Sequence, residues 1–91
     1  MKAARNLRIH GVSFEKAARI FLDANHVVTE NYFIEEQGEQ RYQAIGKGGE
    51  LVLLLVVFVA RSGQDEEIIH IISARKATAY EKSVYQDQFR Q

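Results

Sequence analysis

The chain carries one long apolar run, Leu51–Ala60, with the sequence LVLLLVVFVA. Apolar residues occupy both parities of this run, which is typical of a strand buried on both faces inside a sheet. A membrane-spanning helix needs about 20 apolar residues, so the run is about half the required length. The run therefore predicts a central strand of a sheet and no membrane role.

Three further segments predict strands around this central one. Val27–Ile34 is rich in β-branched and aromatic residues, Arg41–Ile45 alternates weakly, and Glu67–Arg75 contains four isoleucines before Ser73. Glycine-containing turns such as Gly46–Gly49 separate the segments. Because connections this short join antiparallel neighbours, the sequence predicts an antiparallel meander.

Two helices are predicted before the first strand. Lys2–His10 has helical spacing of its apolar residues, and Gly11 supplies the left-handed residue that commonly follows a helix. Ser13 is a good N-cap for a second helix. The apolar residues of that helix recur with the spacing of a face that lies on a core: Phe14, Ala17, Ala18 and Phe21.

A third helix is predicted at the C-terminal end. Thr78 is followed three residues later by Glu81, the spacing of a capping box. Tyr80, Val84 and Phe89 are expected to face inward. The predicted fold is α+β, one domain over residues 1–91, with a four-stranded antiparallel sheet, two N-terminal helices and one C-terminal helix, all on one face of the sheet.

The composition excludes several classes of chemistry. The chain has no cysteine, so disulfides and thiolate catalysis are absent, which fits a cytoplasmic protein. The histidines His10, His26 and His70 lie on three different elements without ligand spacing, so no metal or other cofactor is expected. Net charge is zero, but the charges are segregated: five cations and one acid precede Ile20, and five acids and no cation follow up to Gln40.

Cations at strand positions are the remaining candidates for function. Arg41, Arg61, Arg75 and Lys76 all fall on the predicted sheet or at strand ends. The planar guanidinium fork suits phosphate because it donates two parallel hydrogen bonds. The competing interpretation is that each arginine pairs with an acidic neighbour such as Glu39, Glu50 or Glu67. Only convergence of several cations on one face would favour phosphate binding.

Motifs spread over nearly the whole chain resemble the BrnT family of ribonuclease toxins from bacterial toxin–antitoxin pairs. Near the N-terminus the resemblance rests on Lys2–Leu7, His10–Glu15 and Phe21; in the middle on Gly38–Arg41, Ile45–Gly46 and Val56–Phe58; and at the end on Ile71–Thr78, Glu81 and Tyr85. The spacing between these motifs is preserved.

The resemblance implies a RelE-like fold, metal-independent RNA cleavage that inhibits translation, and a BrnA-type antitoxin with a ribbon-helix-helix part. A base would take the proton of a ribose 2′-hydroxyl, cations would stabilise the phosphorane-like charge, and an acid would protonate the leaving oxygen. On this basis the expected catalytic residues are His10, Arg41, Arg75 and Lys76. His10 is the first candidate for the proton carrier, and Glu39 and Tyr85 are the alternatives. The expected RNA-binding residues are Arg61, Arg8 and Lys47.

The chain departs from the family pattern in three places. It lacks the usual tryptophan-containing first strand, Ile9 stands where a lysine is common, and His70 stands where an arginine is usual. A missing strand would expose an edge that invites pairing with another chain. Alternatives therefore stay open: a weak or inactive binding module that only contacts an antitoxin, or a homodimer. In a regular strand His70 and Arg75 have opposite parity, so they are expected on different faces unless a β-bulge intervenes.

Overall fold

The computed structural model describes residues 2–36, 38–62 and 64–90 of the 91-residue chain. Within these ranges the chain forms three α-helices, two 3₁₀ helices and four strands. In chain order they are α1 (Lys2–His10), α2 (Phe14–Ala18), η1 (Arg19–Leu22), β1 (Val27–Ile34), β2 (Glu39–Lys47), η2 (Gly49–Leu51), β3 (Leu53–Ser62), β4 (Glu67–Lys76) and α3 (Ala79–Asp87).

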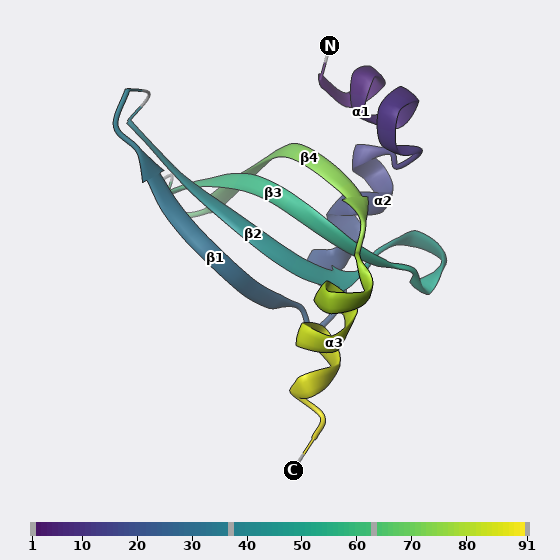
Figure 1. The fold of residues 1–91 in the computed structure, drawn as a ribbon. Coiled ribbons are helices and arrows are strands. Elements are labelled where there is room, and N and C mark those ends of the chain that lie inside the picture. Colours follow the sequence, from purple (N-terminus) through teal and green to yellow (C-terminus); the bar gives the residue numbers. More distant parts are fainter. Residues whose placement is uncertain (1, 37, 63, 91) are drawn as a thin grey trace.

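The four strands form one antiparallel sheet in the order β1-β2-β3-β4, which confirms the predicted meander (Figure 1). The apolar run supplies β3, which pairs with β2 on one side and β4 on the other. The strand begins two residues later than predicted. Glu50 and Leu51 adopt left-handed backbone angles, with φ of 64° and 60°, and Leu51 is 77% exposed. That turn keeps the start of the apolar run out of the sheet.

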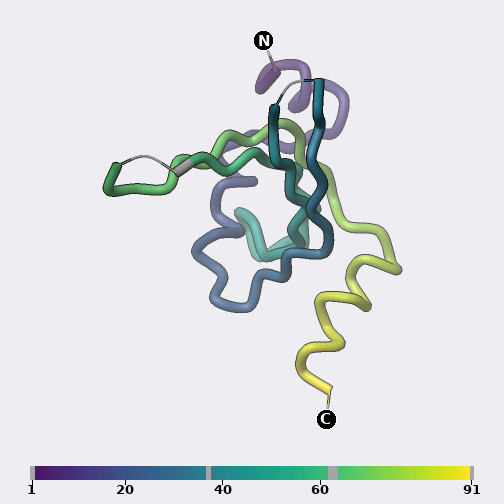
Figure 2. Tube along the Cα trace, turned by 90° about the vertical axis from the view of Figure 1, so that its left-hand side faces the viewer, coloured from purple at the N-terminus to yellow at the C-terminus, as the bar shows by residue number. Residues whose placement is uncertain are grey.

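Helices cover both faces of the sheet, so the expectation that all three lie on one face is wrong (Figure 2). On one face Ala17 of α2 and Ile20 of η1 pack in a core with Val56. On the other face Tyr85 of α3 packs with Ile45 and Leu55. The physical reason lies in β3 itself: a strand that is apolar at both parities must bury both of its faces. The third helix covers the second face at one end.

Helix α1 is held against the edge strand β4 by one buried polar side chain. The Asn6 amide nitrogen donates to the carbonyl oxygens of Val12 and Ala74, at 2.9 and 2.8 Å. Its oxygen accepts the Ala74 N–H at 3.0 Å. Edge strands present unpaired backbone groups, and here the side chain of Asn6 satisfies both groups of Ala74.

The predicted helix signals are confirmed. Gly11 has φ of +70° after α1, and the Ser13 hydroxyl accepts the Lys16 N–H at 3.1 Å. Both hydrogen bonds of the capping box between Thr78 and Glu81 are present. The inward-facing positions of α3 were predicted less well. Val84 packs on the core and Tyr85 is buried, but Tyr80 and Phe89 are exposed, because α3 lies across the sheet with Tyr85 at the contact.

Candidate functional site

An extra residue in β4 decides which side chains share a face of the sheet. Val57 pairs with Ser73, whereas the next residue of β3, Phe58, pairs with Ile71. Ile72 therefore has no counterpart on β3, which makes it a β-bulge. The bulge shifts the side-chain alternation by one position, so His70 lies on the same face as Arg75. In a regular strand the two would lie on opposite faces.

A row of side chains crosses this face. Arg41 of β2 pairs with Val59 of β3, and Val59 pairs with His70 of β4. Two strand spacings separate Arg41 from His70, or about 10 Å between Cα atoms. Tyr32 of β1 pairs with Arg41 and extends the row. The row lies beyond the end of the sheet that α3 covers (Figure 1).

We call this uncovered region the open face and define it by Arg41, Arg61, Ile68 and His70. Arg61 and Ile68 are paired neighbours, and the adjoining pair is formed by Ala60 and Ile69, whose side chains lie on the other face. Arg61, Ile68 and His70 are exposed, so the open face is accessible to a ligand.

Two arginines of the open face share one carboxylate. Glu39 Oε1 lies 3.4 Å from Arg41 Nη2, and Glu39 Oε2 lies 3.1 Å from Arg61 Nη2. The Arg61 side chain is 62% exposed, and those of Arg41 and Glu39 are largely covered. Two guanidinium groups thus contact the same carboxylate. The guanidinium groups can bind an anion, with the exposed Arg61 as the first contact.

Arg75 forms a bidentate ion pair with Glu81 at the start of α3. Its Nη1 and Nη2 atoms lie 2.7 and 2.9 Å from the two carboxylate oxygens. The hydrogen bonds from Arg75 hold the pKa of Glu81 below its usual value, and the same hydrogen bonds raise the pKa of Arg75. The pair fastens the end of β4 to α3. The charge of Arg75 is therefore paired with that of Glu81.

The structure does not bring the other predicted site residues to the open face. Lys76 pairs with Leu54, whose side chain belongs to the core on the opposite face, and it lines a small pocket with Lys16 and Glu50. His10 lines a separate pocket beside the edge of β4, together with Ser73.

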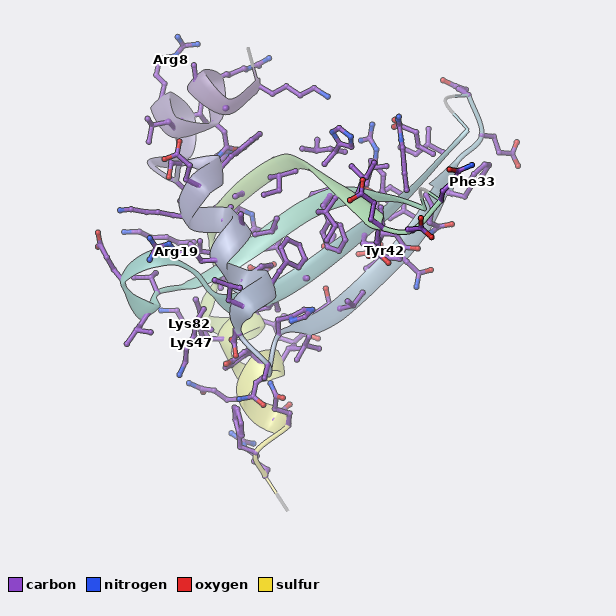
Figure 3. The ribbon with its side chains drawn as sticks, turned by 180° about the vertical axis from the view of Figure 1, so that it is seen from behind. Arg8, Arg19, Phe33, Tyr42, Lys47 and Lys82 are labelled. Atoms are coloured by element: carbon purple, nitrogen blue, oxygen red, sulfur yellow. The ribbon has the colours of Figure 1, made fainter. Side chains whose placement is uncertain are left out.

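Arg8 and Lys47 lie still farther from the open face. Arg8 extends from the outer side of α1, away from the sheet (Figure 3). Lys47 ends β2, six residues beyond Arg41, so the two Cα atoms are about 20 Å apart along the strand. The backbone N–H of Lys47 donates to Asp23 at 2.9 Å. By register Arg41, Arg61, Arg75 and Lys47 lie on one face, but among them the structure brings together only Arg41 and Arg61, through Glu39.

Tyr85, an alternative candidate for the proton carrier, is enclosed by the protein. It is 2% exposed, and its hydroxyl donates to Asp23 Oδ2 at 2.8 Å. Burial and this hydrogen bond raise the pKa of Tyr85 to about 12. Burial opposes ionisation of Asp23, but its hydrogen bonds from the Lys47 and Asn25 backbones and from Tyr85 outweigh that effect and lower its pKa. A side chain so enclosed cannot reach a substrate.

His70 shares a face with Arg75 only because of the bulge, which is the exception that the sequence-based expectation allowed. Regular alternation would separate the two side chains. The bulge at Ile72 has no local signal, because no glycine or proline marks it. The bulge is seen only in the register between β4 and β3.

The described residues contain no group of three or more histidine, cysteine or acidic side chains placed to hold a metal ion. Within the same ranges, no helix has both the length and the apolar character that crossing a bilayer requires.

Comparison with known proteins adds one finding to this geometry. No curated protein matches the sequence. Residues 1–81 match the family model described as the ribonuclease toxin BrnT of type II toxin–antitoxin systems. The match includes α1, the whole sheet and the Arg75–Glu81 pair, and it ends within α3. The chain therefore belongs to the BrnT family of type II toxin–antitoxin ribonuclease toxins.

Proposed function

We propose that the chain is a metal-independent endoribonuclease that cleaves RNA on the open face. RNA carries its own nucleophile, the ribose 2′-hydroxyl, so the protein needs only positioned cations and groups that move protons. When the 2′-oxygen attacks, the P–O5′ bond breaks and a 2′,3′-cyclic phosphate forms. The proton leaves the 2′-oxygen and another is delivered to the 5′-oxygen.

Arg61 and Arg41 are proposed to bind the scissile phosphate. Arg61 is the more exposed of the two and makes the first contact, and the phosphate then competes with Glu39 for both guanidinium groups. His70, across Val59 from Arg41, is the proposed proton carrier. The observation that carries the proposal is this placement of Arg41 and His70 on one uncovered face. Arg75 lies on the same side of the sheet, at the end that α3 covers, and is proposed to act from there. His10, Lys76 and Lys47 stay predictions outside this group, and Arg8, which points away from the sheet, is left out of the proposal.

The test is cleavage of a single-stranded RNA by the purified protein in buffer containing EDTA. We expect products that end in a 2′,3′-cyclic phosphate and no cleavage of a 2′-O-methyl copy of the same RNA. Arg41→Ala and His70→Ala are expected to lower the cleavage rate, because each removes a proposed active group. Lys82→Ala, an exposed cation on α3, is the matched control and is expected to cleave normally. Equal rates for all three variants would refute the assigned roles.

The partner and the cellular effect are proposed from family membership. A type II toxin is neutralised by a protein antitoxin, and we propose a BrnA-type ribbon-helix-helix antitoxin for this chain, acting in the cytoplasm. RNA cleavage would inhibit translation and arrest growth when the toxin is expressed alone. We expect the arrest to be relieved by the neighbouring antitoxin gene and by Arg41→Ala, measured as colony formation after induction.

One observation favours a second function, that of a binding module without catalysis. Arg41, Arg61 and Arg75 each pair with a carboxylate in this structure, so each guanidinium already has an anionic partner. A protein of this kind would bind its antitoxin, or a second copy of itself, through the same fold. Healthy growth with a soluble, folded toxin and no RNA cleavage would support this alternative and refute the ribonuclease proposal.

A further inference from the structure

A second cationic site lies at the junction of α1 and β4, outside the open face. A pocket of about 300 Å³ opens between one side of α1 and the edge of β4. Lys2, Arg5, Ile9 and His10 line it from the helix, where their spacing puts them on a common face. The residues at the bulge, Ile72 and Ser73, line it from the strand.

The positive charges of this pocket are not balanced by the protein. None of the described residues that line the pocket carries a carboxylate. Among the described residues, the side chains of Lys2, Arg5 and His10 form neither an ion pair nor a hydrogen bond. In contrast, the cations of the open face and of the β4–α3 junction all pair with Glu39 or Glu81. Cations that share a pocket without a carboxylate are poised to bind an anion.

The base of the pocket is fixed in place. Asn6 lies on the same side of α1 as Lys2 and Arg5, and its amide makes three hydrogen bonds to the backbones of Val12 and Ala74. Because Asn6 is 5% exposed, these bonds anchor the helix from within. The flanking cations are thereby held beside the strand before any ligand arrives, which lowers the entropy cost of binding one.

We propose that this pocket binds a backbone phosphate of the RNA substrate, next to the nucleotides that lie on the open face. The inference rests on the proposed function and assigns Lys2 and Arg5 to substrate binding, not to catalysis. Ser73 connects the two sites: it lines the pocket, and it shares the sheet face with His70 and Arg75. An RNA strand that crosses the edge of β4 at Ser73 would contact both sites at once.

RNA is favoured over an acidic protein segment by the shape of the site. The pocket is small, and its polar lining combines the charged groups of Lys2 and Arg5 with the side chains of Asn6, His10 and Ser73. That lining suits a single phosphate with its ribose, which pairs with a guanidinium through two oxygens. An acidic peptide from an antitoxin is the competing ligand, and the test below separates the two.

The chain offers a matched pair of variants for the test. Arg5 and Arg8 lie on the same helix and are both exposed, but Arg5 lines the pocket and Arg8 points away from the sheet (Figure 3). Arg5→Ala and Arg8→Ala therefore remove the same charge from positions one turn apart on α1, one that lines the pocket and one that points away from the sheet. Arg5→Lys keeps the charge in the pocket and serves as the conservative variant.

Binding is measured by fluorescence anisotropy with a labelled 2′-O-methyl RNA oligonucleotide, which cannot be cleaved by 2′-oxygen attack. We expect Arg5→Ala to weaken binding about tenfold at low salt, as expected for one lost charged hydrogen-bonded contact. The slope of log K against log salt should fall by about 0.7, the value for one phosphate contact on a single strand. Arg5→Lys should restore most of the affinity, and Arg8→Ala should change it little.

The outcomes separate this inference from the proposed function. If the wild-type protein cleaves RNA but Arg5→Ala binds and cleaves normally, the pocket proposal is wrong and the ribonuclease proposal stands. If Arg5→Ala weakens binding to uncleavable RNA while the wild type cleaves nothing, the pocket proposal stands alone. Equal losses in Arg5→Ala and Arg8→Ala, no RNA binding by the wild type, or a loss confined to antitoxin binding would each overturn the inference.

Discussion

The Asn6 side chain hydrogen-bonds both the N–H and the carbonyl of Ala74, a residue 68 positions later in the chain. At the free edge of β4, the Asn6 amide thus takes the place that the backbone of a further strand would occupy. It also places α1 where its cations meet the bulge at Ile72. The position of a whole helix thus depends on one buried amide.

Replacing Asn6 with Ala is expected to destabilise the protein by about 2 to 4 kcal/mol, because several buried backbone groups lose their partner. Urea denaturation of the wild type and the variant measures this difference in the free energy of unfolding. Leu7→Ala is the control, since its side chain is half exposed and it neighbours Asn6 on the same helix. A loss of less than about 0.5 kcal/mol would mean that α1 is held in another way.

Glu39→Gln is expected to strengthen RNA binding. The change removes the carboxylate that Arg41 and Arg61 share, so phosphate no longer competes for either guanidinium. We expect an increase in affinity of severalfold for uncleavable RNA and a stability change of no more than about 1 kcal/mol, as is usual for partly exposed ion pairs.

The control for that variant is Glu36→Gln, an exposed acid of the β1–β2 connection that removes the same charge. If both variants raise the affinity equally, the effect comes from net charge alone. If Glu39→Gln weakens binding or abolishes cleavage, Glu39 has a role in the reaction itself.

The Asp23–Tyr85 hydrogen bond predicts a loss of stability in alkali. Tyr85 has its pKa raised from 10.0 to about 12 in the folded protein, so the neutral form is favoured by folding. This contribution is complete below pH 10 and is lost as the pH rises through about 12. Tyr85→Phe should lower stability by about 1 kcal/mol at pH 7.

Urea denaturation at several pH values between 8 and 12 (roughly the span of the two pKa values) tests this linkage. The difference in unfolding free energy between the wild type and Tyr85→Phe should shrink across that range. A difference that stays constant would show that the hydroxyl contributes through packing alone.

Glu81→Gln isolates the ion pair with Arg75 from the helix cap. Glutamine can still accept from the Thr78 N–H, as in other capping boxes, but it carries no charge to pair with Arg75. We expect a loss of about 1 kcal/mol at neutral pH, since the pair is only partly buried.

The lowered pKa of Glu81 predicts how the stability difference between the wild type and Glu81→Gln changes in acid. The pKa of Glu81 is lowered in the folded protein, so its contribution is present above the unfolded value of 4.5 and is lost as the pH falls below it. Wild type and Glu81→Gln should therefore converge in stability in acid. Thr78→Ala, which removes the cap and keeps the charge, should not converge in the same way.

The sequence by itself determined the elements and their order. The apolar run predicted β3 as an inner strand, because a segment that is apolar at both parities needs cover on both faces, and only Leu51 and Val52 at its start lie outside the strand. Gly11, Ser13 and the pair Thr78–Glu81 marked helix ends correctly, because capping depends on residues within one turn of each other. These signals are local, and local signals can be read without the fold.

Tertiary structure decided which side chains share a face. The bulge at Ile72 moves His70 to the face of Arg75, and only the pairing of β4 with β3 specifies it. The side on which α3 packs, and the sharing of Glu39 between Arg41 and Arg61, depend on contacts between distant segments. Side chains alternate between the two faces of a strand, so one extra residue moves every later side chain to the other face. The composition and the residue spacing of β4 do not indicate where such a residue occurs.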